Sequence, residues 1–316
     1  MTEKPVLLVK SAGPQSLPRW QAEFARLTPH LDIRWWDDPT IDQARVRYCI
    51  VWFPDHGRIA AMPNIEVVFS SAAGVDHIVS DPSLPHRLPI VRMVSDELAQ
   101  TIGEYVTLAA LMILRDQPRM AALQRARSWE YFEPVRTAVG TRVGILGLGA
   151  MGRRAAAMLS GIGFQILGWS RTAKAIPGIR TFQGDDGLAR MLPDCHILIV
   201  LLPETPSTRG LIDARRLAML PEGAGLINAA RGPIVVARDV IAALDGGRLS
   251  CAILDVFDTE PLPADEPLWQ HPKVMVTPHL AGYATLRAKA RYVAGQIGRH
   301  EAGLGLENLY DRMRGY

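Results

Sequence analysis

This 316-residue sequence has few cysteines and no closely paired histidines, and we expect no leader segment. Its three cysteines, Cys49, Cys195 and Cys251, are an odd number set far apart in apolar segments, which excludes a disulfide framework and the paired spacing of a zinc site. The eight histidines are equally scattered, so we expect no metal. The apolar run after Met1 is too short for a signal peptide.

Long apolar runs and a strong net charge are also missing. No stretch approaches the roughly 18 apolar residues of a membrane-spanning helix, so we expect no membrane partner and a cytoplasmic location. Net charge is only +3, too little for a basic nucleic-acid-binding face, so we expect no nucleic acid partner. A hydrophobic content of 48% excludes disorder for most of the chain, and the length predicts two domains.

Short apolar runs alternate with helical patterns along the whole chain, which predicts two doubly wound parallel α/β sheets. We expect a flavodoxin-like domain and a Rossmann domain, with a ligand cleft between them at the carboxyl ends of the strands. One long helix over residues 96–115 leads from the first domain to the second. The expected strands are 6–9, 33–36, 48–53, 67–69, 90–94, 142–146, 165–169, 196–201, 224–228, 251–256 and 274–276.

A glycine-rich loop follows the first strand of the second half. Gly147, Gly149 and Gly152 match the G-x-G-x-x-G pattern between an apolar strand and an Ala-rich helix, a context that predicts a dinucleotide pyrophosphate at the helix N-terminus. Without that context the pattern would be a weak signal, and a glycine turn with no ligand is the alternative. The residues expected to contact the cofactor are Gly147, Leu148, Gly149, Ala150, Met151 and Gly152.

The end of the next strand carries the signal for the choice of coenzyme. An acidic residue there would bind the ribose 2′-hydroxyl of NAD, but this chain has Ser170, Arg171 and Thr172, with Lys174 close by. Hydroxyls and cations favour a 2′-phosphate. We therefore expect NADP(H) to be preferred, with NAD(H) possible; Arg171 as an ordinary surface residue is the alternative.

Three further loops follow apolar strands and supply a cation, a carboxylate and an imidazole: Arg231, Glu260 and His279. Reduction of a 2-oxo acid needs a cation to hold the carboxylate and polarise the carbonyl, and an acid to protonate the developing alkoxide. Arg231 and His279 can fill these roles, and Glu260 would stabilise the imidazolium. Taken singly, each also has a structural explanation, as a loop cap, a surface charge and a buried loop histidine.

Together these segments resemble the signatures of the D-isomer-specific 2-hydroxyacid dehydrogenases, in the same order and over nearly the whole chain. The segments are 143–152, 228–232, 255–261 and 278–279. Segments 71–77 and 169–172 are most similar to the glyoxylate/hydroxypyruvate reductase A group of that family. The chain departs from the family at Thr101–Glu104, where a Val-Ala-Glu run is more common, and Gly103 would loosen that helix slightly.

The resemblance implies a role for each loop. Arg231 would bind the substrate carboxylate and carbonyl, His279 would donate the proton, and Glu260 would be its partner. Backbone N–H groups of Gly74 and Val75 would hold the carboxylate from the first domain, although a plain tight turn is the alternative there. Three more residues are implied at the cofactor: Asp255 at the nicotinamide carboxamide, and Leu202 and Pro203 along the cleft.

We therefore expect hydride transfer from NADPH to a small 2-oxo acid, with glyoxylate and hydroxypyruvate as the first candidates. Trp52 ends an apolar strand and would wall the substrate pocket, unless it is a simple core residue. The expected domains are residues 1–99 with 284–316 for substrate and 100–283 for NAD(P). Apolar and aromatic residues over 96–115 and 120–131 predict a homodimer, since the family pairs subunits there; ordinary interdomain core is the alternative.

Two other readings remain open. The chain could be a phosphoglycerate-type or formate-type dehydrogenase, which share the fold and the three residues, although Ser170 argues against an NAD enzyme. It could also be a dinucleotide-sensing binding protein like the carboxy-terminal-binding-protein corepressors, because fold alone does not decide function.

Overall fold

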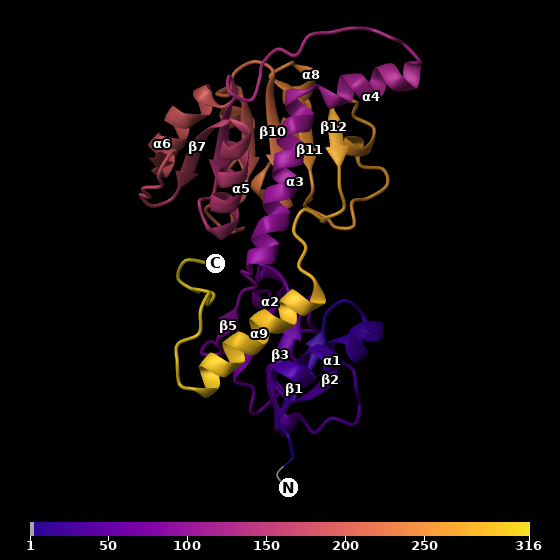
Figure 1. Cartoon of the computed structure of the whole chain (residues 1–316), viewed down its shortest axis with the longest axis vertical. Helices are drawn as coiled ribbons and strands as arrows, with labels where there is room; N and C mark the ends of the chain where they lie inside the picture. The colour runs from indigo at the N-terminus through magenta and orange to yellow at the C-terminus, as the bar shows by residue number, and fades with distance from the viewer. Residues whose placement is uncertain (1–2) are drawn as a thin grey trace. The chain divides into compact units, whose positions relative to one another are not determined.

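The computed structural model describes residues 3–316. Contacts divide the chain into two compact units. The first runs to Glu97 and resumes at Ala284–Tyr316, and the second is Leu98–Tyr283. Each unit has one sheet in which all neighbouring strands are parallel, which confirms the expected α/β fold class (Figure 1).

The first unit has the strand order β2-β1-β3-β4-β5, the flavodoxin order. The buried runs of β1 and β3 form its centre, and α1 packs against α9. The strands are β1 (Val6–Lys10), β2 (Asp32–Trp35), β3 (Val46–Val51), β4 (Val67–Ser70) and β5 (Ile90–Val91). The helices are α1 (Leu17–Leu27), α2 (Asp76–Val79) and α9 (Leu286–Glu301), with short 3-10 turns at Pro14–Ser16 and Gln43–Arg45.

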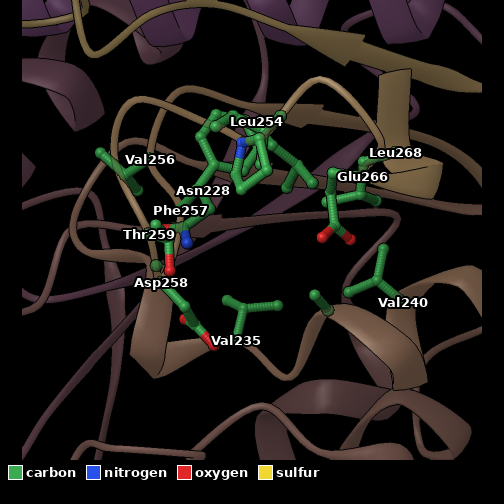
Figure 2. A pocket seen from close by; sticks show the side chains of 14 residues that line it. Asn228, Val235, Val240, Leu254, Val256, Phe257, Asp258, Thr259, Glu266 and Leu268 are labelled. Carbon is green, nitrogen blue, oxygen red and sulfur yellow. The ribbon is translucent and has the colours of Figure 1, made fainter. Parts of the chain in front are cut away.

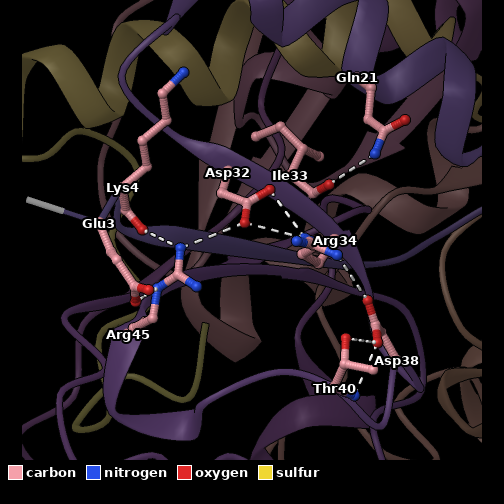
Figure 3. Close-up of polar contacts among 9 residues, drawn as sticks. All are labelled: Glu3, Lys4, Gln21, Asp32, Ile33, Arg34, Asp38, Thr40 and Arg45. Atoms are coloured by element: carbon pink, nitrogen blue, oxygen red, sulfur yellow. Dashed lines mark hydrogen bonds and ion pairs between the residues drawn. The ribbon is translucent and has the colours of Figure 1, made fainter. Parts of the chain in front are cut away.

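Charged residues cover the edge strand β2, as Figure 3 shows. Arg34 donates from Nε to both carboxylate oxygens of Asp32 at 3.0 Å and from a terminal nitrogen to Asp38 at 3.2 Å. Two hydrogen bonds from Thr40 also hold the Asp38 carboxylate and lower its pKa. Charges along an edge strand discourage pairing with a strand of another molecule, and β2 is an edge strand of this five-stranded sheet.

The second unit has the strand order β12-β11-β10-β9-β6-β7-β8, the Rossmann order with one additional strand. Its strands are β6 (Arg142–Leu146), β7 (Gln165–Ser170), β8 (Arg180–Gln183), β9 (Ile197–Val200), β10 (Ala224–Asn228), β11 (Leu249–Leu254) and β12 (Val274–Val276). Its helices are α3 (Asp96–Leu114), α4 (Gln117–Ala126), α5 (Ala150–Ile162), α6 (Gly184–Met191), α7 (Ala214–Ala218) and α8 (Ala237–Asp245), with 3-10 turns at Leu192–Asp194, Gly232–Ile234 and Pro267–Trp269.

Two apolar clusters pack on this second sheet. In one, α3 and α5 contribute Val106, Ala110, Ala155 and Leu159. In the other, helices α6, α7 and α8 contribute residues such as Leu188. Apolar residues on successive turns of the helices thus meet continuous apolar strands, as in a parallel sheet covered on both faces.

Helix α3 bears on the membrane expectation. Within residues 3–316 it is the one helix that passes a test of length and mean composition for crossing a membrane, although Asp96, Glu97 and Glu104 interrupt its apolar residues. The composition has a structural cause, because Ile102, Val106 and Ala109 lie in the core of the second unit. One such helix is weak evidence for a membrane, and the absence of a membrane partner and the cytoplasmic location stay predictions.

Candidate active site

The chemically active side chains of the second unit follow three neighbouring strands. Arg231 comes three residues after β10, Asp255 directly after β11, and His279 three residues after β12. In the sheet β11 lies between β10 and β12. Because parallel strands end at the same edge, the three loops share that edge with the glycine-rich loop after β6 and the turn after β7.

The glycine-rich loop has the geometry of a tight strand-to-helix turn. Gly147 has a φ of 103°, and a Cβ there would lie 2.5 Å from the carbonyl oxygen of Leu201. Gly149 is the N-cap of α5, and a Cβ at Gly149 would meet nothing within 4 Å. A Cβ at Gly152 would overlap the carbonyl oxygen of Gly147. The open N-terminus of α5 thus fits a pyrophosphate group.

The turn after β7 is positively charged and tied to the glycine-rich loop. Lys174 donates to the carbonyl oxygen of Leu148 at 2.9 Å, and Ser170 donates to the carbonyl oxygen of Thr172 at 2.7 Å. Burial, together with the nearby charge of Arg153, lowers the pKa of Lys174. The exposed Arg171 lies in the same turn, which therefore fits an anion.

The predicted cofactor residues Leu202 and Pro203 come shortly after β9, beside β6 in the sheet. Leu202 is buried at 9% exposure. Thr208 donates its hydroxyl to the carbonyl oxygen of Pro203 at 2.7 Å, and the backbone N–H of Thr205 donates to the same hydroxyl at 2.8 Å. These bonds fix the loop that carries the two residues.

Asn228, at the end of β10, organises the loop that carries Arg231. Its buried amide donates to the carbonyl oxygen of Arg231 at 3.1 Å and accepts from the N–H of Ala230 at 3.2 Å. The Arg231 guanidinium itself donates to the carbonyl oxygen of Ala230 at 2.7 Å. A Cβ at the next residue, Gly232, would overlap the backbone of Phe257, so the Arg231 loop lies directly against the loop that leads to Glu260.

His279 and Glu260 form the pair that the sequence predicted to be partners. His279 Nδ1 lies 2.6 Å from Glu260 Oε2, and both side chains are about one-third exposed. The other oxygen of Glu260 accepts from the N–H of Phe257 at 2.9 Å, which fixes the carboxylate. A carboxylate on Nδ1 fixes the imidazole tautomer and leaves Nε2 as the nitrogen that can exchange a proton with a reacting atom.

Asp255 is buried at 1% exposure and holds the loop that carries His279. Its Oδ1 accepts from Thr277 Oγ1 at 2.5 Å and from the N–H of Leu280 at 2.9 Å, and its Oδ2 accepts from the N–H of Ala281 at 2.9 Å. The sequence predicted a contact with nicotinamide for this residue. The structure gives the carboxylate a positioning role instead, and the nicotinamide contact stays a prediction.

The sequence analysis missed Asn228, Thr277 and Tyr105. Tyr105, on α3, places its hydroxyl 2.7 Å from Thr277 Oγ1, and burial raises the pKa of Tyr105 to about 12, so the phenol keeps its proton. Asn228 begins one of the segments that the sequence had already selected and Thr277 directly precedes another, and each carries an amide or a hydroxyl at a strand end. Tyr105 had no comparable signal, because it precedes its partner by more than 170 residues.

A cavity of about 120 Å³ lies beneath these loops (Figure 2). Its lining includes Asn228, Gly232, Leu254, Val256 and Phe257. Arg231, Glu260 and His279 are not among its lining residues. At this volume the cavity is too small to hold a dinucleotide.

In the first unit, Trp52 and the turn at Gly74 and Val75 follow the neighbouring strands β3 and β4. The Trp52 ring lies 4.4 Å from the ring of His77 and 4.9 Å from that of Phe53. Ser70 donates its hydroxyl to the carbonyl oxygen of Gly74 at 2.8 Å, which tightens the turn. These residues share one edge of the first sheet, and their role in binding substrate stays a prediction.

Comparison with known proteins gives a family match and close relatives. Residues 107–281 match the family model described as the NAD binding domain of D-isomer specific 2-hydroxyacid dehydrogenases. The chain is 35% identical over 302 residues to a glyoxylate/hydroxypyruvate reductase A from Serratia proteamaculans, covering 94% of this chain and 96% of the relative.

Solved structures give the same result. A D-isomer specific 2-hydroxyacid dehydrogenase from Xanthobacter autotrophicus Py2, solved with NADPH and MES, has a TM-score of 0.94 and 40% identity, and the match covers 100% of both chains. An NADPH-dependent glyoxylate/hydroxypyruvate reductase from Sinorhizobium meliloti, solved with NADP and sulfate, has a TM-score of 0.92 and 35% identity over 99% of this chain and 100% of the other.

The close approach of Gly152 to Gly147 leads to a prediction that can be tested without a bound ligand. Gly152→Ala places a methyl group against the carbonyl oxygen of Gly147, so we expect it to lower the free energy of unfolding by about 1–3 kcal/mol. The control Gly161→Ala lies in the same helix, in open space, and should raise the free energy of unfolding by up to about 1 kcal/mol. Urea unfolding measures both variants. Equal effects of the two substitutions would contradict the close approach at Gly152.

Proposed function

This chain belongs to the D-isomer specific 2-hydroxyacid dehydrogenase family, and from that premise we propose that it is an NADPH-preferring reductase of small 2-oxo acids, glyoxylate and hydroxypyruvate first. The observation that carries the proposal is the His279–Glu260 pair at 2.6 Å, on a sheet edge shared with Arg231. A proton donor held by a carboxylate, beside a cation, is the arrangement that reduction of a 2-oxo acid requires.

In the proposed mechanism Arg231 binds the substrate carboxylate and draws electron density from the carbonyl. His279 delivers a proton from Nε2 to the oxygen at C2, while Glu260 on Nδ1 stabilises the imidazolium before transfer. The reduced nicotinamide, when bound, supplies the hydride that C2 receives. The protein's contribution is to orient the oxo acid and to compensate the charge that develops on its oxygen.

The proposed cofactor site runs along the carboxyl edge of the second sheet. The open N-terminus of α5 at Gly149 supports a pyrophosphate there. The positive turn with Ser170, Arg171 and Thr172 supports a 2′-phosphate, and both solved relatives described above were determined with NADPH or NADP. The loop of Leu202 and Pro203 would supply an apolar wall of the cofactor site. Asp255 would contact the nicotinamide carboxamide by one hydrogen bond in addition to the three that it already accepts.

We propose that residues 100–283 bind NADP(H) and that residues 1–99 with 284–316 bind substrate. The support for the second assignment is the edge of the first sheet, where Trp52 packs against His77 and Phe53 and would wall a substrate pocket. Gly74 and Val75 lie in a turn whose N–H groups suit a carboxylate. A small aromatic-walled site favours short oxo acids.

A homodimer is also proposed, through the segment that follows α4. Trp129, Tyr131 and Val135 in that segment have exposed fractions of 102%, 85% and 86%, and large apolar side chains that gather on a surface favour a protein interface. Phe132 and Val135 also line a hollow of about 680 Å³. A second copy of the chain would cover these side chains.

The first test concerns the reacting residues. His279→Ala should lower kcat for glyoxylate reduction by about 10²–10⁴-fold, since it removes the proton donor, and Arg231→Ala should also raise the KM for glyoxylate. Arg238→Ala is the matched control, because its side chain is 88% exposed. NADPH oxidation at 340 nm measures all three. Near-normal turnover by His279→Ala contradicts the mechanism, and tight NADPH binding without wild-type turnover would favour a sensor.

The second test concerns the coenzyme. Arg171→Ala should raise the KM for NADPH about tenfold or more and leave the KM for NADH nearly unchanged, because only NADPH carries the 2′-phosphate that a guanidinium binds. The exposed Arg190→Ala on α6 serves as control. Steady-state kinetics with both coenzymes decide, and a wild-type preference for NADH would refute the assignment.

The third test concerns the dimer. Replacing Trp129 and Tyr131 together by Ser should shift the chain toward monomer, whereas Met313→Ser, at an equally exposed apolar residue, should not. Light scattering over a range of concentrations measures the mass. A wild-type monomer, or a dimer that survives the double substitution, argues against this interface.

A further inference from the structure

Helix α3 carries two hydroxyl side chains one turn apart, Thr101 and Tyr105, and both contact the loop of His279. Tyr105 reaches Thr277, two residues before His279, at 2.7 Å. Thr101 reaches the backbone of Tyr283, four residues after His279. The helix therefore contacts the chain on both sides of the proposed proton donor.

The contact before His279 passes through a carboxylate. Thr277 donates its single hydroxyl proton to Asp255 at 2.5 Å, so in the 2.7 Å pair the phenol of Tyr105 must be the donor. The same carboxylate accepts the N–H groups of Leu280 and Ala281. A hydrogen-bonded chain thus runs from α3 to the two peptide groups that follow His279.

The contact after His279 is a clamp on the backbone. Thr101 donates to the carbonyl oxygen of Tyr283 at 2.7 Å and accepts from its N–H at 3.0 Å. Its Oγ1 also lies 3.1 Å from the carbonyl oxygen of Leu98, within the helix. Next to the clamp, a Cβ at Gly282 would lie 3.1 Å from side-chain carbons of Leu98 and Ile102, so the loop packs closely on the helix.

His279 needs this support because its backbone is strained. Its φ is 51°, in the left-handed region, which is unfavourable for a residue that carries a Cβ. Such a conformation persists only where surrounding bonds determine it. The hydrogen bonds of Thr277 before His279 and of Tyr283 after it hold the backbone of His279 in this conformation.

We propose that Thr101 and Tyr105 are positioning residues for the reduction, which hold the loop of His279 through Tyr283 and through the Thr277–Asp255 pair. Neither residue touches the reacting atoms. This inference rests on the proposed function, because it takes His279 as the proton donor. The residues act on the rate of the chemical step, through the position of Nε2, and leave cofactor binding unchanged.

The test uses Tyr105→Phe and Thr101→Val in the full chain. Each should lower the single-turnover rate of NADPH oxidation by glyoxylate about fivefold, the rate equivalent of one ordinary hydrogen bond, with the Kd for NADPH unchanged. Thr101→Ser should restore the rate. Thr107→Val is the matched control, because Thr107 Oγ1 on the same helix is buried with no hydrogen-bond partner among residues 3–316.

A second readout does not depend on catalysis. Amide hydrogen exchange of the peptide that covers residues 277–283 should become faster in Tyr105→Phe and Thr101→Val and stay unchanged in Thr107→Val and Tyr292→Phe. Tyr292→Phe removes a hydroxyl that donates to the carbonyl oxygen of Arg92 at 2.9 Å in the first unit. It therefore shows how much exchange changes when a tyrosine hydroxyl bond is lost away from the loop of His279.

The outcomes separate the two proposals. If His279→Ala keeps its turnover, the proposed function fails, whatever the exchange shows. If His279→Ala is inactive but Tyr105→Phe and Thr101→Val match Thr107→Val in rate and exchange, the positioning role is refuted and the function stands. Should Tyr105→Phe fail to fold, Thr101→Val and its rescue by Thr101→Ser decide alone.

Discussion

The carboxylate of Asp255 is the group on which the site depends. A carboxylate at 1% exposure must be compensated, and here the compensation comes from one hydroxyl and two backbone N–H groups. Both N–H groups follow His279 directly along the chain. The need to satisfy one buried charge therefore determines the path of the loop and the place of the imidazole.

Close contacts between backbone segments also fix the loops that carry Arg231 and Glu260. Gly232 lies against the backbone of Phe257, whose N–H fixes one oxygen of Glu260. Any side chain at Gly232 would push this loop away from Arg231 and carry Glu260 with it. The loops of Arg231 and Glu260 are thus set by close backbone contact, while the loop of His279 is set by the Asp255 carboxylate.

The sequence was sufficient for the fold class, the family and the His279–Glu260 pairing, because each depends on local pattern. Strands show as apolar runs, and Arg231, Glu260 and His279 each follow such a run. Tyr105 and Thr101 could not be found in this way. Their partners lie more than 170 residues away, and a hydroxyl in an apolar helix has no local signature. The composition of the same helix suits a membrane as well as a core, since burial in a core and burial in lipid both favour apolar residues.

Cationic side chains lie together near the turn after β7. This grouping explains how a chain of net charge +3 can suit anionic ligands. Near the turn after β7, the partly buried Lys174 lies close to the charge of Arg153, and burial and this charge both lower the pKa of Lys174. The Lys174 ammonium is oriented by the carbonyl oxygen of Leu148, an acceptor without net charge. An anion that arrives there meets a cation that is already in position, and the remaining surface can stay nearly neutral.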